Sequence, residues 1–352
     1  MKGKNNQKQE ENKKAEEVPT GKKDEGYFDQ ALRPDNFNDY IGQEKVKENL
    51  KIIIEAAKRR EETADHMLFS GQAGLGKTTL AMLVAREMGS GLKITSGPAL
   101  KKVGDLAAVL SNLEPREVLF IDEAHRLNHL VEEFLYPAME SQKLHLIVGK
   151  GTGARTISLD LPPFTLVAAT TRADLLSAPL RSRFGASFKL DYYNQQDIEK
   201  IIIRSAGLLT VKIEREAIRI LAEASRATPR IANRLLKRAR DYAEVRGDGI
   251  VTEEIAKKAL ELLEVDFLGL EPHDRKLIQV VIEKFNGGPV GIETLAAALN
   301  EERGVIEEVY EPYLMSVGFL HRTPAGRVIT EAAYKHLGIK TREQKLLEEA
   351  GF

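Results

Sequence analysis

Short apolar runs alternate with amphipathic stretches between residues 65 and 193 of the chain. Three runs have the length and composition of buried strands: HMLFS at 66–70, VLFID at 118–122 and FTLVAATT at 164–171. A glycine-rich turn follows the first run and leads into an amphipathic helix that ends at Gly89. The pattern predicts an α/β fold in which a parallel sheet with flanking helices presents polar groups at its carboxyl edge.

The β signal fades after Tyr193, and residues 195–262 have the periodicity of amphipathic helices, which favours a small helical second domain. Farther on, three helical segments precede a short hairpin, GFLHRTPAGRVIT, and this order is typical of a winged helix. The expected segments are a tail at 1–26, a large α/β domain at 27–193, a helical domain at 194–264, a winged-helix domain at 265–338 and a C-terminal tail at 339–352.

The N-terminal tail is rich in Lys and Glu, has no aromatic side chain and has almost no aliphatic one. Such a segment buries too little apolar surface to offset the entropy lost on ordering, so we expect a disordered tail. Its lysines are interpreted as solvated charges rather than as phosphate contacts.

Composition narrows the choice of partners. The 352 residues include 52 Lys and Arg against 53 Asp and Glu, so global charge indicates neither a nucleic-acid nor a membrane partner. The absence of cysteine excludes disulfides, thiolate zinc sites and a cysteine nucleophile. No apolar run approaches the roughly 20 residues that span a bilayer, and no signal peptide is apparent, so we expect a cytoplasmic protein.

Two alternating segments about a turn with three glycines lie between the second and third apolar runs, in KLHLIVGKGTGARTISLDL. They predict a β-hairpin, residues 143–161. A hairpin that projects with Leu146, Ile147 and Val148 would offer a docking surface for a partner. A hairpin folded back on its own domain fits the sequence equally well.

The glycine-rich turn GQAGLGKT fits the P-loop pattern and stands between a strand and a helix, as that motif requires. Glycines such as Gly74 and Gly76 let backbone N–H groups face phosphates at the start of the helix. Lys77 would reach the β- and γ-phosphates, Thr78 would coordinate Mg²⁺, and Thr79 would add a phosphate contact. The expected ligands are therefore ATP and Mg²⁺.

Two carboxylates, Asp122 and Glu123, end the apolar strand VLFI. A buried strand that ends in two carboxylates needs a cation or hydrogen-bond donors to neutralise them. This order is expected of a Walker B element, in which Asp122 holds the magnesium shell and Glu123 orients the attacking water.

Polar residues after the third strand supply the remaining phosphate contacts. Thr170 and Thr171 end FTLVAATT, where a hydroxyl can contact the γ-phosphate or the water, and Thr171 is assigned this role. In the helical domain, the sequence Thr228-Pro229-Arg230 begins a helix, and from there Arg230 could touch the γ-phosphate.

Arg181 and Arg183 lie on the short segment PLRSRFG, which is flanked by proline and glycine. The rigid, always charged fork of arginine suits a phosphoryl group in transfer. If Arg183 acts on a neighbour's nucleotide, the enzyme must be a ring or a filament. A surface arginine in a salt bridge is the alternative.

These motifs, in this order, resemble the RuvB family of AAA+ ATPases, which drive branch migration of Holliday junctions. The resemblance covers residues 28 to 338 and rests on ALRPDNFNDYIGQ, GLGKTTLA, SGPAL, GDLAAVLSNL, VLFIDEAHRL, VEEFLYPAME, GARTISLDLPPFTLVAATTR, PLRSRFG, TPRIANRLL and RTPAGR. Many AAA+ proteins share the nucleotide motifs, whereas the hairpin sequence and RTPAGR are far more restrictive.

The resemblance implies further roles at the nucleotide. The adenine pocket would be formed by Leu32, Arg33, Tyr40, Ile41, Tyr193 and Arg230. A segment that contacts nucleotide from an adjacent position would be Glu132, Glu133 and Phe134. Arg183 would be the arginine finger, acting across the subunit interface of a homohexameric ring.

The same resemblance implies partners. The hairpin from Leu144 to Ile157 would dock the junction-binding protein RuvA, with Ile147 and Val148 as its apolar tips. RuvC would join for resolution. Arg322 and Arg327 would be the wing residues that contact DNA.

The residues themselves support a DNA contact at the wing. No acidic residue occurs between 312 and 330, so His321 and the two wing arginines form a local positive patch. The expected recognition helix carries Glu307, Glu308 and Glu311, which would repel phosphates in a major groove. We therefore expect duplex DNA to be bound without sequence specificity.

The chain departs from the usual family pattern at Gln72, Ala73, Ala124 and Thr152. None of these changes removes a catalytic group. The charged N-terminal tail has no family counterpart to which a role can be assigned.

The resemblance thus implies an ATP-hydrolysing DNA helicase of the bacterial cytoplasm that acts in homologous recombination, DNA repair and the SOS response. Its catalytic residues would be Lys77, Asp122, Glu123, Thr171 and Arg183. A clamp-loader ATPase and a winged-helix regulator switched by nucleotide are the alternatives.

Overall fold

The computed structural model describes residues 30–148 and 155–340. Both expected tails lie wholly or largely outside this part, as does Thr152 in the hairpin turn. The chain divides into two units, Met1–Arg33 and Pro34–Phe352. In the described end of the first unit, the Arg33 N–H donates to the carbonyl oxygen of Gln30 at 3.2 Å. All elements below belong to the second unit.

A five-stranded parallel sheet forms the centre of the large domain, in the order β2-β3-β6-β1-β7. Its strands are β1 (Met67–Ser70), β2 (Leu92–Ser96), β3 (Val118–Asp122), β6 (Thr165–Thr170) and β7 (Ala186–Lys189). The three apolar runs of the sequence are β1, β3 and β6, so the predicted α/β core is confirmed. The edge strands β2 and β7 are more exposed and had not been predicted.

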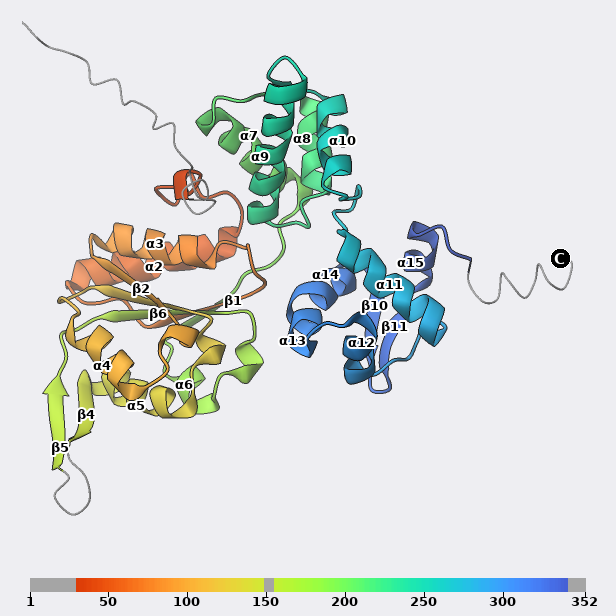
Figure 1. Cartoon of the computed structure of the whole chain (residues 1–352). Helices are drawn as coiled ribbons and strands as arrows, with labels where there is room; N and C mark the ends of the chain where they lie inside the picture. Colours follow the sequence, from red (N-terminus) through yellow and green to blue (C-terminus); the bar gives the residue numbers. More distant parts are fainter. Residues whose placement is uncertain (1–29, 149–154, 341–352) are drawn as a thin grey trace, which may run out of the picture. The chain divides into compact units, whose positions relative to one another are not determined.

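Helices cover both faces of the sheet (Figure 1). One face carries α2 (Glu44–Arg60) and α3 (Lys77–Met88), and the other carries α4 (Val103–Ser111), α5 (His129–Ser141) and α6 (Ala178–Ser182). Strand β3 shows why its sequence is continuously apolar: Val118 and Phe120 join one core cluster, whereas Leu119 and Ile121 join the other. Successive strand residues face opposite sides, so both sides of this strand are buried.

The hairpin forms a separate antiparallel pair of strands, β4 (Lys143–Val148) and β5 (Arg155–Asp160). Its base packs on the domain through Leu144, which is buried, and through Leu146. Strand β5 is exposed along its whole length. Figure 1 shows the pair leaving the body of the domain, which favours the projecting arrangement. The side chains of Ile147 and Val148 lie outside the described part of the chain.

The second domain is helical, as predicted. It consists of α7 (Gln195–Leu208), α8 (Arg215–Glu223), α9 (Pro229–Arg246) and α10 (Glu253–Leu262), with a short parallel pair, β8 (Lys212–Ile213) and β9 (Ile250–Val251). Apolar residues at helical spacing, among them Ile198 and Ile202 on α7, form its core.

The third domain is the predicted winged helix. Helices α11 (Pro272–Phe285) and α12 (Ile292–Leu299) precede a third, which comprises α13 (Arg303–Val305), the π-helical turn η5 (Ile306–Tyr310) and α14 (Glu311–Ser316). The wing is the antiparallel pair β10 (Leu320–Thr323) and β11 (Gly326–Ile329), and α15 (Glu331–His336) follows it. No helix in the described ranges is both long enough and apolar enough to cross a membrane.

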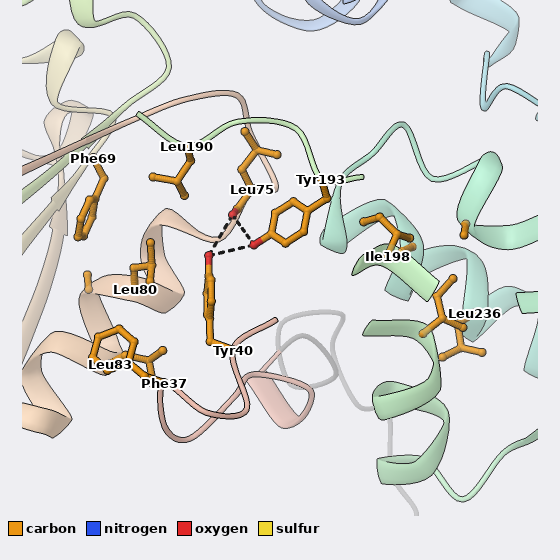
Figure 2. Packing of buried hydrophobic residues seen from close by; sticks show 14 of the residues in the cluster. Phe37, Tyr40, Phe69, Leu75, Leu80, Leu83, Leu190, Tyr193, Ile198 and Leu236 are labelled. Carbon is orange, nitrogen blue, oxygen red and sulfur yellow. Dashed lines mark hydrogen bonds between the residues drawn. The ribbon is translucent and has the colours of Figure 1, made fainter. Parts of the chain in front are cut away.

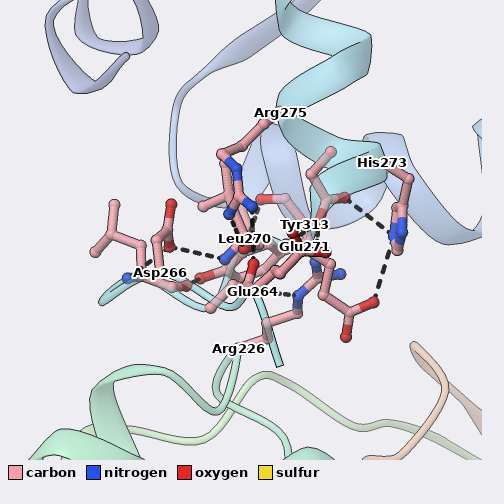
Figure 3. Close-up of polar contacts among 12 residues, drawn as sticks. Arg226, Glu264, Asp266, Leu270, Glu271, His273, Arg275 and Tyr313 are labelled. Carbon is pink, nitrogen blue, oxygen red and sulfur yellow. Dashed lines mark hydrogen bonds and ion pairs between the residues drawn. The ribbon is translucent and has the colours of Figure 1, made fainter. Parts of the chain in front are cut away.

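Polar contacts hold the segment that joins the helical domain to the winged helix (Figure 3). Arg226 is buried, donates to the carbonyl oxygen of Gly269 at 2.7 Å and pairs with the buried carboxylate of Asp274. Its guanidinium lies 4.8 Å from the centre of the Tyr313 ring. A buried charge requires such partners, so this arginine is structural in the joining segment.

Candidate nucleotide site and DNA-contacting wing

The carboxyl ends of β1, β6 and β3 lie side by side because these strands are neighbours in the sheet. The P-loop follows β1, Thr170 ends β6, and Asp122 ends β3. The fold thereby brings together three motifs that are far apart in the sequence.

Lys77 begins helix α3, and only 8% of its surface is exposed. Its ammonium group donates to the carbonyl oxygens of Gly71 at 2.6 Å and Gln72 at 2.8 Å. Burial lowers the pKa of Lys77 to about 8, although the nearby Asp122 carboxylate acts in the opposite direction. The loop therefore holds this cation in a position from which it can meet a phosphate.

Thr78 and Asp122 form the oxygen donor set of the site. The Thr78 hydroxyl lies 3.5 Å from Oδ2 of Asp122, and Oδ1 of Asp122 accepts the Glu123 N–H at 2.9 Å. A hydroxyl and a carboxylate are hard oxygen ligands, which suit Mg²⁺. The two residues predicted to hold the metal are thus adjacent.

Glu123 has an unusual backbone conformation, with φ at 48° in the left-handed region. Its half-exposed carboxylate pairs with Arg126 at 3.1 Å. Gly97 lies against it: a Cβ at that glycine would be 2.4 Å from the Glu123 carbonyl oxygen. Non-glycine residues in this conformation are uncommon and cluster at functional sites. Gly97 belongs to the SGPAL motif, but its supporting contact could not be derived from that motif.

The two threonines at the end of β6 have different surroundings. Thr170 is fully buried, and its hydroxyl contacts Nδ1 of His125 at 3.0 Å and accepts the Arg172 N–H at 2.9 Å. Thr171 follows the strand and is partly exposed. The internal bonds of Thr170 are consistent with the assignment of Thr171 to the phosphate. His125, whose pKa is lowered by burial, had not been singled out.

Two tyrosines pack against the P-loop (Figure 2). The Tyr193 hydroxyl donates to the Tyr40 hydroxyl at 3.0 Å, and the Tyr40 hydroxyl lies 3.4 Å from the carbonyl oxygen of Leu75. Burial raises the pKa of Tyr193 to about 12 and that of Tyr40 well above its usual value. Both phenols are therefore neutral and act as hydrogen-bonding groups. Ile41, the neighbour of Tyr40, is partly exposed.

Gly76→Ala is expected to lower ATP affinity about tenfold or more. Gly76 has φ at 99°, and an added Cβ would lie 2.6 Å from the Tyr40 hydroxyl. An alanine in the left-handed conformation costs about 1–2 kcal/mol, so the loop of the variant would leave the conformation that binds nucleotide. Each 1.4 kcal/mol that binding must spend to restore this conformation lowers the affinity tenfold. Fluorescent nucleotide titration measures the effect. Gly89→Ala is the control, because φ there is 65° but nothing lies within 4 Å. Equal losses in both variants would contradict a local effect on the loop.

Arg230 lies in the first turn of α9, after Thr228 and Pro229. A Cβ at Gly74 would be 3.1 Å from the Cβ of Arg230 and 3.6 Å from that of Thr228. The start of α9 is therefore next to the P-loop. Thr79, on the first turn of α3, is partly buried.

The remaining residues of the expected adenine pocket, Leu32 and Arg33, belong to the first unit of the chain. Their assignment stays a prediction.

Arg183 caps the C-terminus of α6. Its side chain lies beside the C-terminal half of α5 in the same domain. Its Nη1 donates to the Pro179 carbonyl oxygen at 2.7 Å, and its guanidinium lies 4.3 Å from the centre of the Tyr136 ring. Its Nε is 3.0 Å from Oε1 of Glu140, an ion pair without hydrogen-bond geometry. The salt-bridged alternative therefore describes this state of the arginine, and Tyr136 and Glu140 are neighbours that the sequence had not indicated.

Glu132, Glu133 and Phe134 are consecutive on α5. A helix turns about 100° per residue, so these three side chains point in different directions. Glu132 is buried, Glu133 is exposed and Phe134 is partly buried. The contact of this segment with nucleotide from an adjacent position stays a prediction.

Arg322 and Arg327 are direct cross-strand partners in the wing. Both pair with the carboxylate of Glu311 on α14. Glu307 is also paired, with Arg303 at 3.1 Å and with Arg327 at 3.2 Å. The expectation that Glu307 and Glu311 repel DNA phosphates is corrected here, because arginines neutralise both.

Three family profiles match successive parts of the chain. They are described as the Holliday junction DNA helicase RuvB P-loop domain, residues 32–190, the RuvB AAA lid domain, residues 193–266, and the RuvB C-terminal winged helix domain, residues 267–338.

Solved structures of Thermotoga maritima RuvB are similar throughout. One, described as the RuvB Holliday junction branch migration motor, is 49% identical, covers 89% of this chain and 100% of its own, and has a TM-score of 0.82. A lysine-to-arginine mutant of the same protein is 48% identical over 88% of this chain and 99% of its own, with a TM-score of 0.82. The chain therefore belongs to the RuvB family of Holliday junction DNA helicases.

Proposed function

We propose that this chain is an ATP-driven motor that moves the branch point of Holliday junctions by pumping duplex DNA. The observation that carries the proposal is the convergence of Lys77, Asp122 and Glu123 at one sheet edge, with Thr78 and Asp122 only 3.5 Å apart. This site occurs in a RuvB-family chain that also has the winged helix.

Each residue at the sheet edge has one task in hydrolysis. Lys77 and the P-loop N–H groups bind and orient the phosphates. Thr78 and Asp122 would hold Mg²⁺, which neutralises phosphate charge when bound. Glu123 orients the attacking water, and Thr171 contacts the γ-phosphate or that water. Arg230, at the start of α9, reports the state of the phosphate to the helical domain.

Arg183 acts on the nucleotide of a neighbouring subunit, in a homohexameric ring. Support comes from its place in the fold: Arg183 shortly precedes β7, whose first residue, Ala186, pairs with Met67 at the start of β1, whereas the P-loop follows the other end of β1. To reach a neighbour, its side chain exchanges the Glu140 carboxylate for a phosphoryl group, which carries more negative charge.

The hairpin β4–β5 is the docking element for RuvA in this proposal, with RuvC joining at resolution. Support comes from its exposure: Ile157 on β5 has 51% of its surface exposed, although it is a large apolar residue. An apolar side chain at such a position suits a protein partner. Ile147 is the cross-strand neighbour of Thr156, and Val148 that of Arg155, so both would lie at the same end of the hairpin.

Branch migration of a synthetic four-way junction tests the proposal. With ATP, Mg²⁺ and RuvA, the wild-type chain is expected to separate the junction into two duplexes, whereas Lys77→Ala is not. Junctions of unrelated sequence should behave alike, because the proposed contact is to phosphates. If ATP is hydrolysed while the junction stays intact, a clamp-loader role is favoured. DNA binding without steady hydrolysis would favour a nucleotide-switched regulator.

The proposed location is the bacterial cytoplasm.

A further inference from the structure

The wing carries two like charges at directly opposed positions. Arg322 on β10 and Arg327 on β11 are paired residues of the antiparallel ladder, so both side chains project from the same face of the hairpin. Like charges in such a pair destabilise a hairpin. Something must therefore compensate the two guanidinium groups.

Two carboxylates compensate the guanidinium groups: Glu307 pairs with only one of them, that of Arg327, at 3.2 Å, whereas Glu311, the first residue of α14, pairs with both arginines. Oε1 of Glu311 accepts Nε of Arg327 at 2.6 Å, and its Oε2 accepts Nη2 of the same arginine at 3.3 Å. The Oε2 atom also accepts Nη2 of Arg322. One carboxylate thus binds both strands of the wing and connects them to the helix.

The three side chains differ sharply in exposure. Glu311 is 0% exposed and Arg327 is 9% exposed, whereas Arg322 is 45% exposed. Arg327 is also fixed from outside the hairpin, because its backbone N–H and carbonyl pair with those of Val290. Arg327 is therefore a buried internal partner, and Arg322 is the member of the pair that reaches solvent.

We propose that Glu311 is a positioning residue for DNA binding: it fixes Arg327 as the internal anchor of the wing and directs Arg322 toward a DNA phosphate. This inference rests on the proposed contact between the wing and duplex DNA, and it divides two arginines of identical chemistry into two roles. A rigid fork such as that of Arg327 suits a buried carboxylate. A guanidinium group that is about half exposed, such as that of Arg322, can bind a DNA phosphate.

The sign of the change in DNA affinity in Glu311→Gln distinguishes a positioning role of Glu311 from a purely electrostatic one. Removing a negative charge near DNA strengthens binding if charge alone acts, whereas loss of positioning weakens it. We expect a loss in duplex affinity of about tenfold, and a salt dependence shallower by about 0.9 in log K against log[salt], the change expected for one lost phosphate contact. The matched control is Glu308→Gln, on the same helical segment. Among the described residues, no ion pair joins Glu308 to either wing arginine. This control should bind equally or more tightly.

The measurement is fluorescence anisotropy of a labelled duplex of arbitrary sequence, titrated with the full chain over a range of KCl concentrations. Arg322→Ala and the double variant Glu311→Gln/Arg322→Ala complete a cycle. Because Glu311 is proposed to act through Arg322, the double variant should bind no more weakly than Arg322→Ala alone. A merely structural role of Glu311 would instead add its loss to that of Arg322. DNA-independent ATP hydrolysis and the unfolding temperature report whether each variant is folded.

Conservative variants provide a second readout. Arg322→Lys keeps a phosphate-binding charge and should retain most of the affinity, whereas Arg327→Lys loses the fork on Glu311 and should resemble Glu311→Gln. Additive losses in the cycle, or tighter binding by Glu311→Gln, would overturn the inference while leaving the wing contact intact. If Arg322→Ala binds DNA with unchanged affinity and salt dependence, the proposed wing contact itself fails.

Discussion

Glu123→Gln is expected to lower ATP turnover by about 10²- to 10⁴-fold, the usual contribution of a positioned general base. The amide keeps the size of the side chain but loses the negative charge that orients and polarises the attacking water. Lys77, Thr78 and Asp122, which bind the phosphates and Mg²⁺ in this proposal, are unchanged. ATP should therefore bind with near wild-type affinity, and assembly on ATP should persist.

Steady-state phosphate release and nucleotide titration, carried out on the same preparation, distinguish these two effects. Glu48→Gln is a suitable control, because Glu48 is an exposed glutamate on α2 of the same domain. It should turn over ATP normally. Normal turnover by Glu123→Gln would remove Glu123 from the catalytic role, and a parallel loss of ATP binding would indicate a structural role instead.

Arg183→Ala is expected to reduce hydrolysis by about 10³- to 10⁵-fold, the range found for arginine fingers. The reason is that the variant loses the cation proposed to meet the charge that develops on the γ-phosphate bound by the neighbouring subunit. The affinity for nucleotide should change little, since the P-loop belongs to the other side of the interface. Branch migration should be abolished with hydrolysis.

Subunit mixing tests the direction of this contact. Lys77→Ala lacks a working P-loop but has an intact Arg183, whereas Arg183→Ala has the reverse defect. In a mixed head-to-tail ring, about one quarter of interfaces combine the intact P-loop of one variant with the intact arginine of the other. Mixing two inactive proteins should therefore restore a fraction of the activity. An arginine that acts within its own chain would give no recovery at any ratio.

The sequence predicted those parts of the fold that depend on local patterns. Strands β1, β3 and β6 are continuously apolar because both of their faces are buried, and Gly89 ends α3 with φ at 65°. Strand β2 lacks this signal, because it is an edge strand on which Ile94 is 58% exposed. Half-exposed edge strands alternate weakly, so their composition does not separate them from loops.

The same distinction between local patterns and long-range contacts applies to the candidate site residues. The motif around Lys77 and the carboxylates after β3 are readable because each is a contiguous segment with a fixed chemical order. The partners Glu140 of Arg183 and Glu311 of Arg327 are not, since each pair joins two elements whose spacing in the sequence carries no periodic signal. Tyr193 and Tyr40 are 153 residues apart; the family resemblance assigned both to the adenine pocket, but the hydrogen bond between them was found only in the structure.

The contact between Gly97 and the Glu123 carbonyl oxygen extends the set of positions on which selection for catalysis acts. Residue 97 has no side chain that could bind, donate or accept, yet any side chain there would displace the backbone that presents the glutamate. A chemically silent position is in this way as constrained as a reactive one. In libraries of variants, lost activity at residue 97 should accompany an intact fold, and searches confined to ionisable residues would overlook it.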